Sequence, residues 1–554
     1  MASDIEEKTT SDLADQGKAD LIKGSAWMTA GSIFSRILGA IYIIPWNMWF
    51  GSVFTATLAN SLFSKGYNIY SFFLIISTAG IPGAISKQIA HYNALNEYQA
   101  GNQLFRQGLK IMALMGIVTA AVMYFGASFI ANIFAGGNKQ AIPVLQALSF
   151  ALLIIPTMSL VRGYFQGYSQ MAPSAISQFI EQVARVIYML VATYWIMKVQ
   201  KGSYVSAVTQ STFAAFIGAI FGLGILVYFL VKQLPKLRKL SQNSKQEIDI
   251  DNKNFFLEIM HQALPFIILD SGIVLFQIFD QATFNSMMSS FQRLGKDTLD
   301  YMYALFGFNA NKLIMIVVSL ATAMAVTAVP LLSAAYSRHD RTEVKGHIGS
   351  TLQLFFLVML PASLGMYAVA KPLYILFYRY DSLGIYILQF SAIVAIVLGL
   401  FTVLAAVLQG LYQNKVAIKC FVIGFIVKMI VQYPMILLFS MFGPLMATMV
   451  GMTVTCWFML RHLRVRFKFN IQQTLYRVCL IFLISVLMLV IISVINLICY
   501  HWLANTNRIA ALCLLIVEVI IGVGVYLYLI LKTRLAEKIV GSRLARLRQK
   551  LRIS

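Results

Sequence analysis

Long apolar runs recur along the whole chain, and each is separated from the next by a short polar break. A run of about 20 apolar residues can cross the ~30 Å hydrocarbon core of a bilayer as a helix. Ten-residue strands of alternating polarity, which would indicate a membrane barrel, do not occur in the sequence. The pattern predicts an all-α integral membrane protein with fourteen transmembrane helices, at residues 24–50, 63–90, 107–135, 141–165, 172–197, 204–231, 257–288, 303–335, 346–370, 383–411, 416–440, 441–460, 472–500 and 509–531.

The distribution of Lys and Arg tests this count, because cytoplasmic loops carry an excess of both residues. With both termini cytoplasmic, 31 of the 44 Lys and Arg residues fall on the inner side and 8 on the outer side. The other five lie within or at the edge of spans. A missed or added span would invert every later loop, so the asymmetry favours fourteen spans with both ends inside.

Composition agrees with a membrane protein, since 59% of residues are hydrophobic and 12% charged, against about 45–50% and about 25% in soluble domains. Basic inner loops facing anionic lipid account for the formal charge of +23, so no nucleic-acid partner is expected. The five cysteines lie in apolar runs without zinc-ligand or disulfide-framework spacing, and no GxxxxGK[ST] phosphate loop occurs. We therefore expect no cofactor, no metal and no ATP requirement. The pair Asp249 and Asp251 is interpreted as part of a solvated linker.

One short motif occurs twice. YFQGYSQ at 164–170 matches VLQGLYQ at 407–413, and the longer alignment keeps a constant offset of 243 that places Arg185 on Lys428. An earlier match places Pro82 on Pro330 at an offset of 248. Spans one to six and seven to twelve are therefore predicted to be two parallel six-helix repeats, related by an axis along the membrane normal. The QGxxQ motif is interpreted as a turn between two helices of each repeat.

The repeat defines the expected domains. An N-terminal lobe and a C-terminal lobe, each of six helices, would enclose a cleft that opens alternately to either side, as in an alternating-access transporter. Two extra helices and a basic tail would follow. The expected segments are a cytoplasmic tail 1–23, an N-lobe 24–231, a cytoplasmic linker 232–256, a C-lobe 257–460, helices thirteen and fourteen within 461–533, and a basic cytoplasmic tail 534–554.

Several charged residues lie within the predicted spans, where each must face protein, water or ligand because burial in lipid costs at least ~2.5–3.5 kcal/mol. We predict that four cations bind substrate: Arg36, Arg185, Lys312 and Lys428. Four acids are candidates for ion coupling or for pairing with these cations: Glu181, Asp270, Asp280 and Glu518. Glu181 stands four residues before Arg185 on one helical face, whereas Arg36 and Lys428 have no acid nearby in the sequence. Arginine and lysine in a cleft suit a phosphate-bearing cargo.

The first two spans, GSIFSRILGAIYIIPW and GYNIYSFFLIISTAGIPGAISKQIAHYNA, and the paired QGxxQ turns resemble the SpoVB/YtgP group of polysaccharide transporters. These are Gram-positive relatives of MurJ lipid II flippases within the multidrug/oligosaccharidyl-lipid/polysaccharide exporter superfamily. The resemblance implies translocation of an undecaprenyl-pyrophosphate-linked peptidoglycan precursor to the outer leaflet of a bacterial cytoplasmic membrane, with basic residues holding the pyrophosphate. Arg36 matches the arginine of the family's FSRxLG motif, but Tyr42 replaces a second arginine found in many members.

Three alternatives remain open from the sequence. The cargo is another polyprenyl-linked glycan, such as a capsule or teichoic precursor, or the chain is a drug or cation antiporter of the MATE type. In a different class, it is a membrane glycan polymerase or a divisome scaffold, although the outer loops are short for a catalytic site. Transport by a non-enzyme is the preferred interpretation, with the glycolipid, membrane lipids and cell-wall synthesis machinery as expected partners. The driving force and the oligomeric state are not predicted.

Overall fold

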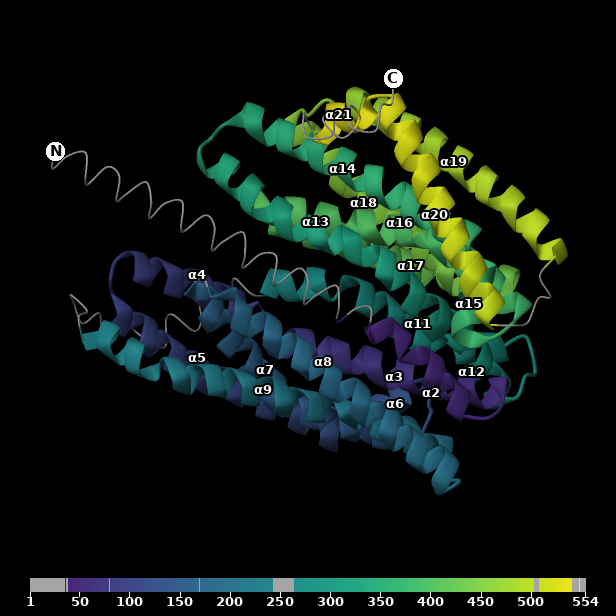
Figure 1. Ribbon diagram of the computed structural model, residues 1–554, viewed down its shortest axis with the longest axis horizontal. Coiled ribbons are helices and arrows are strands. Elements are labelled where there is room, and N and C mark those ends of the chain that lie inside the picture. The colour runs from purple at the N-terminus through teal and green to yellow at the C-terminus, as the bar shows by residue number, and fades with distance from the viewer. Residues whose placement is uncertain are drawn as a thin grey trace. The chain divides into compact units, whose positions relative to one another are not determined.

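The computed structural model describes residues 35, 38–78, 80–168, 170–242, 264–502, 508–540 and 548. In these ranges the regular structure is helical throughout and contains no strand, which confirms the all-α class (Figure 1). Many large hydrophobic side chains of these helices are exposed, among them Leu114, Val191, Ile430 and Leu497. Such exposure suits a lipid-facing surface.

Within the described residues, eleven helices are long and apolar enough to cross a membrane, or twelve if one bent pair is counted as a single span. That pair is Leu264–Asp270 and Gly272–Ser289, which are bent by 54°. The predicted count of fourteen is not confirmed. The first expected span, 24–50, is described only at residue 35 and from residue 38 onward, and the eleventh and twelfth fall in one apolar stretch, Asn414–Phe467. That stretch holds two helices, α17 and α18, which pack against each other and are separated by the short turn η3.

The described chain divides into two compact units, with boundaries between residues 50 and 51, 64 and 65, and 267 and 268. The first unit contains α2, the C-terminal part of α3 and the helices that follow α3 up to α9. Its elements are α2 (Ile43–Trp49), α3 (Val53–Thr78), α4 (Ile81–Ala94), α5 (Tyr98–Phe125), α6 (Ala127–Phe134), α7 (Ala141–Gly167), α8 (Met171–Tyr194), the π-helix η1 (Trp195–Val199) and α9 (Tyr204–Gln242). Its core joins α4, α5, α7 and α9 through buried residues such as Ile85, Leu104, Leu160 and Leu226.

The second unit contains the N-terminal part of α3 and every element from α11 onward. Its elements are α11 (Gly272–Ser289), α12 (Lys296–Ala304), the π-helix η2 (Leu305–Ala310), α13 (Asn311–Ser337), α14 (Arg341–Ala368), α15 (Ala370–Tyr378), α16 (Ser382–Gly410), α17 (Asn414–Phe439), η3 (Ser440–Phe442), α18 (Gly443–Phe467), α19 (Ile471–Trp502), α20 (Arg508–Lys532) and α21 (Leu535–Val540). Two of these helices begin at aspartates whose side chains accept backbone N–H groups, Asp340 before α14 and Asp381 before α16.

The last two long helices form an added pair in the second unit. In Figure 1, α19 and α20 run side by side along α14 and α15, and the contacts between these helices agree. Leu360 of α14, Ile481 and Ile492 of α19 and Ile530 of α20 share one buried cluster. The Tyr526 hydroxyl also donates to the carbonyl oxygen of Leu357, at 2.6 Å. The C-terminal pair is therefore anchored by packing and by buried hydrogen bonds.

The repeated QGxxQ motif forms the same helix-to-helix turn in each unit. Helix α7 ends at Gly167 and α16 at Gly410, and a new helix begins four residues later in both cases. The backbone N–H of Gln170 donates to Phe165 O at 2.9 Å, and that of Gln413 donates to Leu408 O at 2.8 Å. Donor and acceptor in the second turn each lie 243 residues after their counterparts in the first.

The same offset extends to the packing around this turn. A Cβ on Gly167 would lie 2.9 Å from Ser86 O and from Ile89, whereas one on Gly410 would lie 3.0 Å from Val329 O and 3.1 Å from Leu332. These neighbours are again 243 residues apart. The contacts around the two turns therefore follow an offset of 243. This is five residues less than the offset of 248 that aligns Pro82 with Pro330. A break at Gly80, with φ +68°, separates α3 from α4, whereas α13 is continuous through the corresponding region.

Candidate functional site

Arg185 of α8 is half-buried in the first unit and lies over an aromatic ring. Its guanidinium carbon is 5.3 Å from the centre of the Tyr67 ring. Three tyrosines interact electrostatically with this guanidinium: Tyr42, Tyr67 and Tyr70. Tyr42 occupies the position at which the resembled family often carries a second arginine. No carboxylate forms an ion pair with Arg185 among the described residues, so its charge is held by aromatic faces and hydroxyl groups.

Glu181 pairs with Arg162 of α7 and not with Arg185, which corrects the expectation of a pair within α8. The Arg162 Nη2 atom lies 2.7 Å from Glu181 Oε2. The same nitrogen donates to Ser177 Oγ at 2.8 Å, and that hydroxyl donates to Gly222 O at 2.9 Å. The cluster therefore connects α7, α8 and α9. Because both charged side chains are largely buried, this pair is a structural clamp of the first unit.

Lys428 of α17 is fully buried in the second unit, and all three of its N–H donors have partners. Its Nζ atom lies 2.8 Å from each of three acceptors: Asp280 Oδ2 and Phe276 O of α11, and Thr448 Oγ1 of α18. Asp280, one of the acids predicted as candidates for pairing, is therefore the partner of Lys428, although it lies 148 residues away in the sequence, on α11. The lysine and the aspartate neutralise each other inside one unit.

Arg185 lies at a close contact between α8 and α9. A Cβ on Gly218 of α9 would lie 2.7 Å from Glu181 O and 3.0 Å from Arg185 Cβ. The glycine therefore lets the two helices approach at the level of the arginine. Any larger residue at position 218 would push the arginine away from its present place.

Lys428 lies at the equivalent contact between α17 and α18. A Cβ on Gly451 would lie 2.7 Å from Gly424 O and 2.9 Å from Lys428 Cβ. Residues 424 and 428 follow positions 181 and 185 by 243, so Arg185 and Lys428 occupy equivalent places in the two units. The surroundings of the two cations nevertheless differ, because Lys428 pairs with Asp280, whereas the described neighbours of Arg185 include tyrosines and no carboxylate ion-pair partner.

Lys312 lies at the start of α13, directly after the π-helix η2. Its Nζ atom is 5.5 Å from the centre of the Phe63 ring and 5.6 Å from that of Phe308. Beside it, buried Asn309 accepts from Asn60 Nδ2 and donates to the Tyr374 hydroxyl, both at 2.9 Å. Lys312 is thus fixed next to a buried polar network of the second unit, in a segment of irregular helix of the kind often found at functional sites.

The remaining predicted site residues are separate from these clusters. Asp270 is exposed at the break before α11. Glu518 of α20 is fully buried, and neither carboxylate oxygen has a hydrogen-bond partner in the described residues. Asn496 is its neighbour on α19, but that amide donates to Ala368 O at 3.0 Å. Arg36 lies outside the described residues.

Two features of this region were not predicted: the role of Arg162 and the group of tyrosines around Arg185. No role was predicted for Arg162, which lies five residues before Gly167, inside α7. Its partners Ser177 and Glu181 stand four residues apart, on one face of the helix that follows the QGxxQ turn, and this spacing is a signal for a clamp across the hairpin. Within the described residues, no group of three or more His, Cys, Asp or Glu side chains could hold a metal ion.

The fold and these buried charges define a class: a multi-pass helical membrane transporter built from two related units. A family model described as polysaccharide biosynthesis protein matches residues 21–336. The chain is also 32% identical over 542 residues to the lipid II flippase MurJ of Bacillus subtilis (strain 168), covering 95% of this chain and 97% of that protein. The chain belongs to this polysaccharide biosynthesis protein family.

Solved structures agree with the fold. A lipid II flippase MurJ in an inward closed conformation superposes with a TM-score of 0.59 and 15% identity, covering 93% of this chain and 99% of that one. An inward-facing multidrug resistance transporter of the MATE family superposes with a TM-score of 0.56 and 13% identity, covering 77% and 98%. At these identities the likeness concerns the fold alone. The relatives are transporters, which agrees with the interpretation that this chain is not an enzyme.

Proposed function

We propose that this protein is a flippase that moves an undecaprenyl-pyrophosphate-linked peptidoglycan precursor, lipid II, from the inner to the outer leaflet of a bacterial cytoplasmic membrane. The similarity to the lipid II flippase MurJ, which extends over 95% of the chain, carries this proposal. Both termini would lie in the cytoplasm, and two lobes close to the expected ranges 24–231 and 257–460 would alternate in access.

The surroundings of Arg185 support a role for this residue in binding the pyrophosphate. A guanidinium can donate two parallel hydrogen bonds to a phosphate group, and it remains charged in an apolar setting. The tyrosine faces around Arg185 stabilise its charge while leaving those donors without a carboxylate partner. We propose that Arg185 and Arg36 hold the pyrophosphate, and that Lys312 is a substrate contact of the second unit. Lys428, whose three donors are satisfied by its own unit, is assigned a structural role.

Export of another polyprenyl-linked glycan is the second candidate function. The family description refers to polysaccharide biosynthesis, and the pyrophosphate contacts proposed above would serve any such lipid. An excess of unpaired carboxylates would be expected for a drug-cation antiporter. The residues proposed here to bind substrate are instead cations, which disfavours the antiporter hypothesis.

The test is complementation of a strain depleted of its resident lipid II flippase. The wild-type chain is expected to restore growth and the amount of lipid II accessible at the outer leaflet. Arg185→Gln and Arg36→Ala should each lower this amount by about tenfold or more, because each removes charge-assisted hydrogen bonds worth ~1.5–3 kcal/mol. Arg106→Gln, which changes an exposed arginine of α5, is the matched control and should behave as wild type.

Membrane levels of all variants are compared by immunoblotting. Equal rescue by Arg185→Gln would remove this residue from the mechanism. Failure of the wild-type chain to restore outer-leaflet lipid II, combined with restored surface display of a capsule or teichoic polymer in a strain lacking that exporter, would favour the second candidate.

A further inference from the structure

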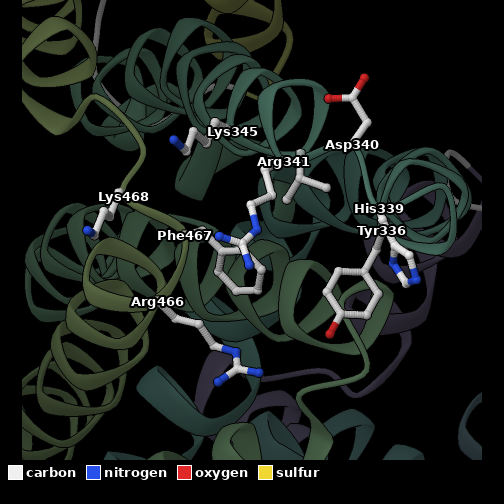
Figure 2. A pocket seen from close by; sticks show the side chains of 9 residues that line it. Tyr336, His339, Asp340, Arg341, Lys345, Arg466, Phe467 and Lys468 are labelled. Carbon is white, nitrogen blue, oxygen red and sulfur yellow. The ribbon is translucent and has the colours of Figure 1, made fainter.

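A basic pocket lies in the second unit, and its lining shares no residue with the clusters around Lys312 and Lys428. It has a volume of about 440 Å³. It is formed where α13 ends, α14 begins and α18 ends, and its lining consists of Tyr336, His339, Asp340, Arg341, Val344, Lys345, Arg466, Phe467 and Lys468. Figure 2 shows these side chains, with Arg341 in the middle of the view near Phe467 and Arg466.

Two helix ends shape this pocket. His339 follows α13 with φ 58°, and Lys468 follows α18 with φ 50°. Both residues are in the left-handed conformation that commonly terminates a helix, and this turns the chain sharply at each end. The two turns bring Arg341 and Lys345 of α14 to the same cavity as Arg466 and Lys468.

The acidic groups near the pocket already have partners. Asp340 Oδ1 accepts the backbone N–H groups of Thr342 and Glu343, at 2.9 and 3.0 Å. Both oxygens of Glu343 accept from Arg338 Nη2, at 2.7 and 2.8 Å. In Figure 2 the Asp340 carboxyl points away from the centre of the pocket. Asp340 therefore interacts with the first turn of α14 and Glu343 with Arg338. Neither carboxylate forms an ion pair with a pocket cation among the described residues.

The four cations of the pocket have no ion-pair partner in the described part of the chain. Arg341, Lys345, Arg466 and Lys468 are all exposed. Like charges that share a cavity repel one another, so an anion that enters the cavity gains attraction from all four. Two of the four are arginines, whose planar donor sets match phosphate oxygens in pairs. Tyr336 and Phe467, with ring centres 6.4 Å apart, provide an apolar wall.

We propose that this pocket, defined by Arg341, Lys345, Arg466 and Lys468, binds a phosphate-bearing group. Its volume suits a pyrophosphate or a phosphoglycerol headgroup more than a large ligand. The two loops that form it are both expected on the cytoplasmic side, where anionic lipids and soluble phosphates are present. The site is separate from the proposed contacts at Arg185, so it does not depend on the transported cargo.

The experiment compares two phosphate sources on the purified full-length chain. Inorganic pyrophosphate is titrated by calorimetry into protein in phosphatidylcholine nanodiscs, and binding of phosphatidylglycerol is counted by native mass spectrometry. The pocket variant is Arg341→Gln/Lys345→Gln/Arg466→Gln/Lys468→Gln. The control, Arg106→Gln/Lys110→Gln/Lys415→Gln/Lys419→Gln, removes four exposed charges that are expected on the same side.

We expect the pocket variant to lose about tenfold or more of the affinity for at least one source, while the control stays within about twofold, because only the pocket cations converge on one site. Loss confined to pyrophosphate identifies a free phosphate as the ligand, and loss confined to phosphatidylglycerol identifies a lipid headgroup. Equal losses in both variants would show diffuse surface charge and overturn the proposal. Absence of binding to the wild type, or binding that survives in the pocket variant, would also overturn it.

Two further controls keep the result interpretable. If the fourfold variant does not give a single folded species, Arg341→Gln/Lys468→Gln is used under the same criteria. Because Arg185 is itself proposed to bind pyrophosphate, the pocket variant and the control variant are also compared in an Arg185→Gln background, where the pocket substitutions should still lower the affinity about tenfold or more relative to Arg185→Gln alone. A failed flippase assay with intact pocket binding would therefore contradict only the proposed function, and the reverse result would contradict only the pocket.

Discussion

Arg185 and Lys428 occupy equivalent positions in the two units, yet among the described residues only Lys428 of the two has a carboxylate partner. Each lies at the contact between its helix and the next one, beside a glycine of that neighbouring helix. Lys428 Nζ is 2.8 Å from Asp280 Oδ2, whereas Arg185 lies over the Tyr67 ring. The same backbone position thus carries a cation paired with a carboxylate in one unit and, as far as the described residues show, a cation surrounded by tyrosines in the other.

Replacing one member of the buried pair should destabilise the second unit. Lys428→Met leaves Asp280 as a buried carboxylate without its cation, and we expect the free energy of unfolding to fall by ~3–5 kcal/mol. The double variant Lys428→Met/Asp280→Asn should recover most of this loss, because neither partner is then charged. Unfolding in mixed detergent micelles with increasing dodecyl sulfate measures both effects.

The transport assay shows whether Lys428 has a structural role or binds substrate. The double variant should restore outer-leaflet lipid II to near the wild-type amount once its membrane level is matched. A double variant that is stable but inactive would assign Lys428 to the substrate and contradict the structural role.

The close approach of α8 and α9 should be sensitive to a single methyl group. A Cβ on Gly218 would meet Glu181 O at 2.7 Å, so Gly218→Ala is expected to lower the free energy of unfolding by ~1–3 kcal/mol. Gly224, on the same helix, has nothing within 4 Å of its Cβ position. Gly224→Ala should therefore be neutral or stabilise the helix by up to about 1 kcal/mol. Thermal aggregation of the two variants in detergent provides the comparison, and similar shifts for both would argue against the packing described.

Glu518 should be replaceable with a gain in stability. Its buried carboxyl has no hydrogen-bond partner in the described residues, and such burial costs ~1–3 kcal/mol on mutational scales. We expect Glu518→Leu to raise the free energy of unfolding by a similar amount, and Glu518→Gln to have a smaller effect. Both variants should restore outer-leaflet lipid II in the depleted strain. Loss of transport at raised stability would instead indicate that this carboxyl carries a proton or an ion.

The sequence was informative wherever a local pattern determines the structure. Apolar length predicted the helices, and the constant offset of 243 predicted both the paired QGxxQ turns and the equivalence of Arg185 with Lys428. The partner of Lys428 could not be predicted in the same way, because Asp280 lies on a non-adjacent helix and no local spacing connects them. Spacing was also misleading for Glu181: the position four residues from Arg185 suggested a pair, but Arg162 reaches it from across the hairpin.

The π-helix η2 is a widened turn directly before α13 and Lys312. Ser64 Oγ donates to Gly307 O at 2.8 Å, which gives the widened turn a partner for one displaced carbonyl. Deleting a single residue of η2 would restore regular α-helical winding and remove the widened turn that Ser64 contacts. This short segment should therefore tolerate substitutions far better than any change in its length.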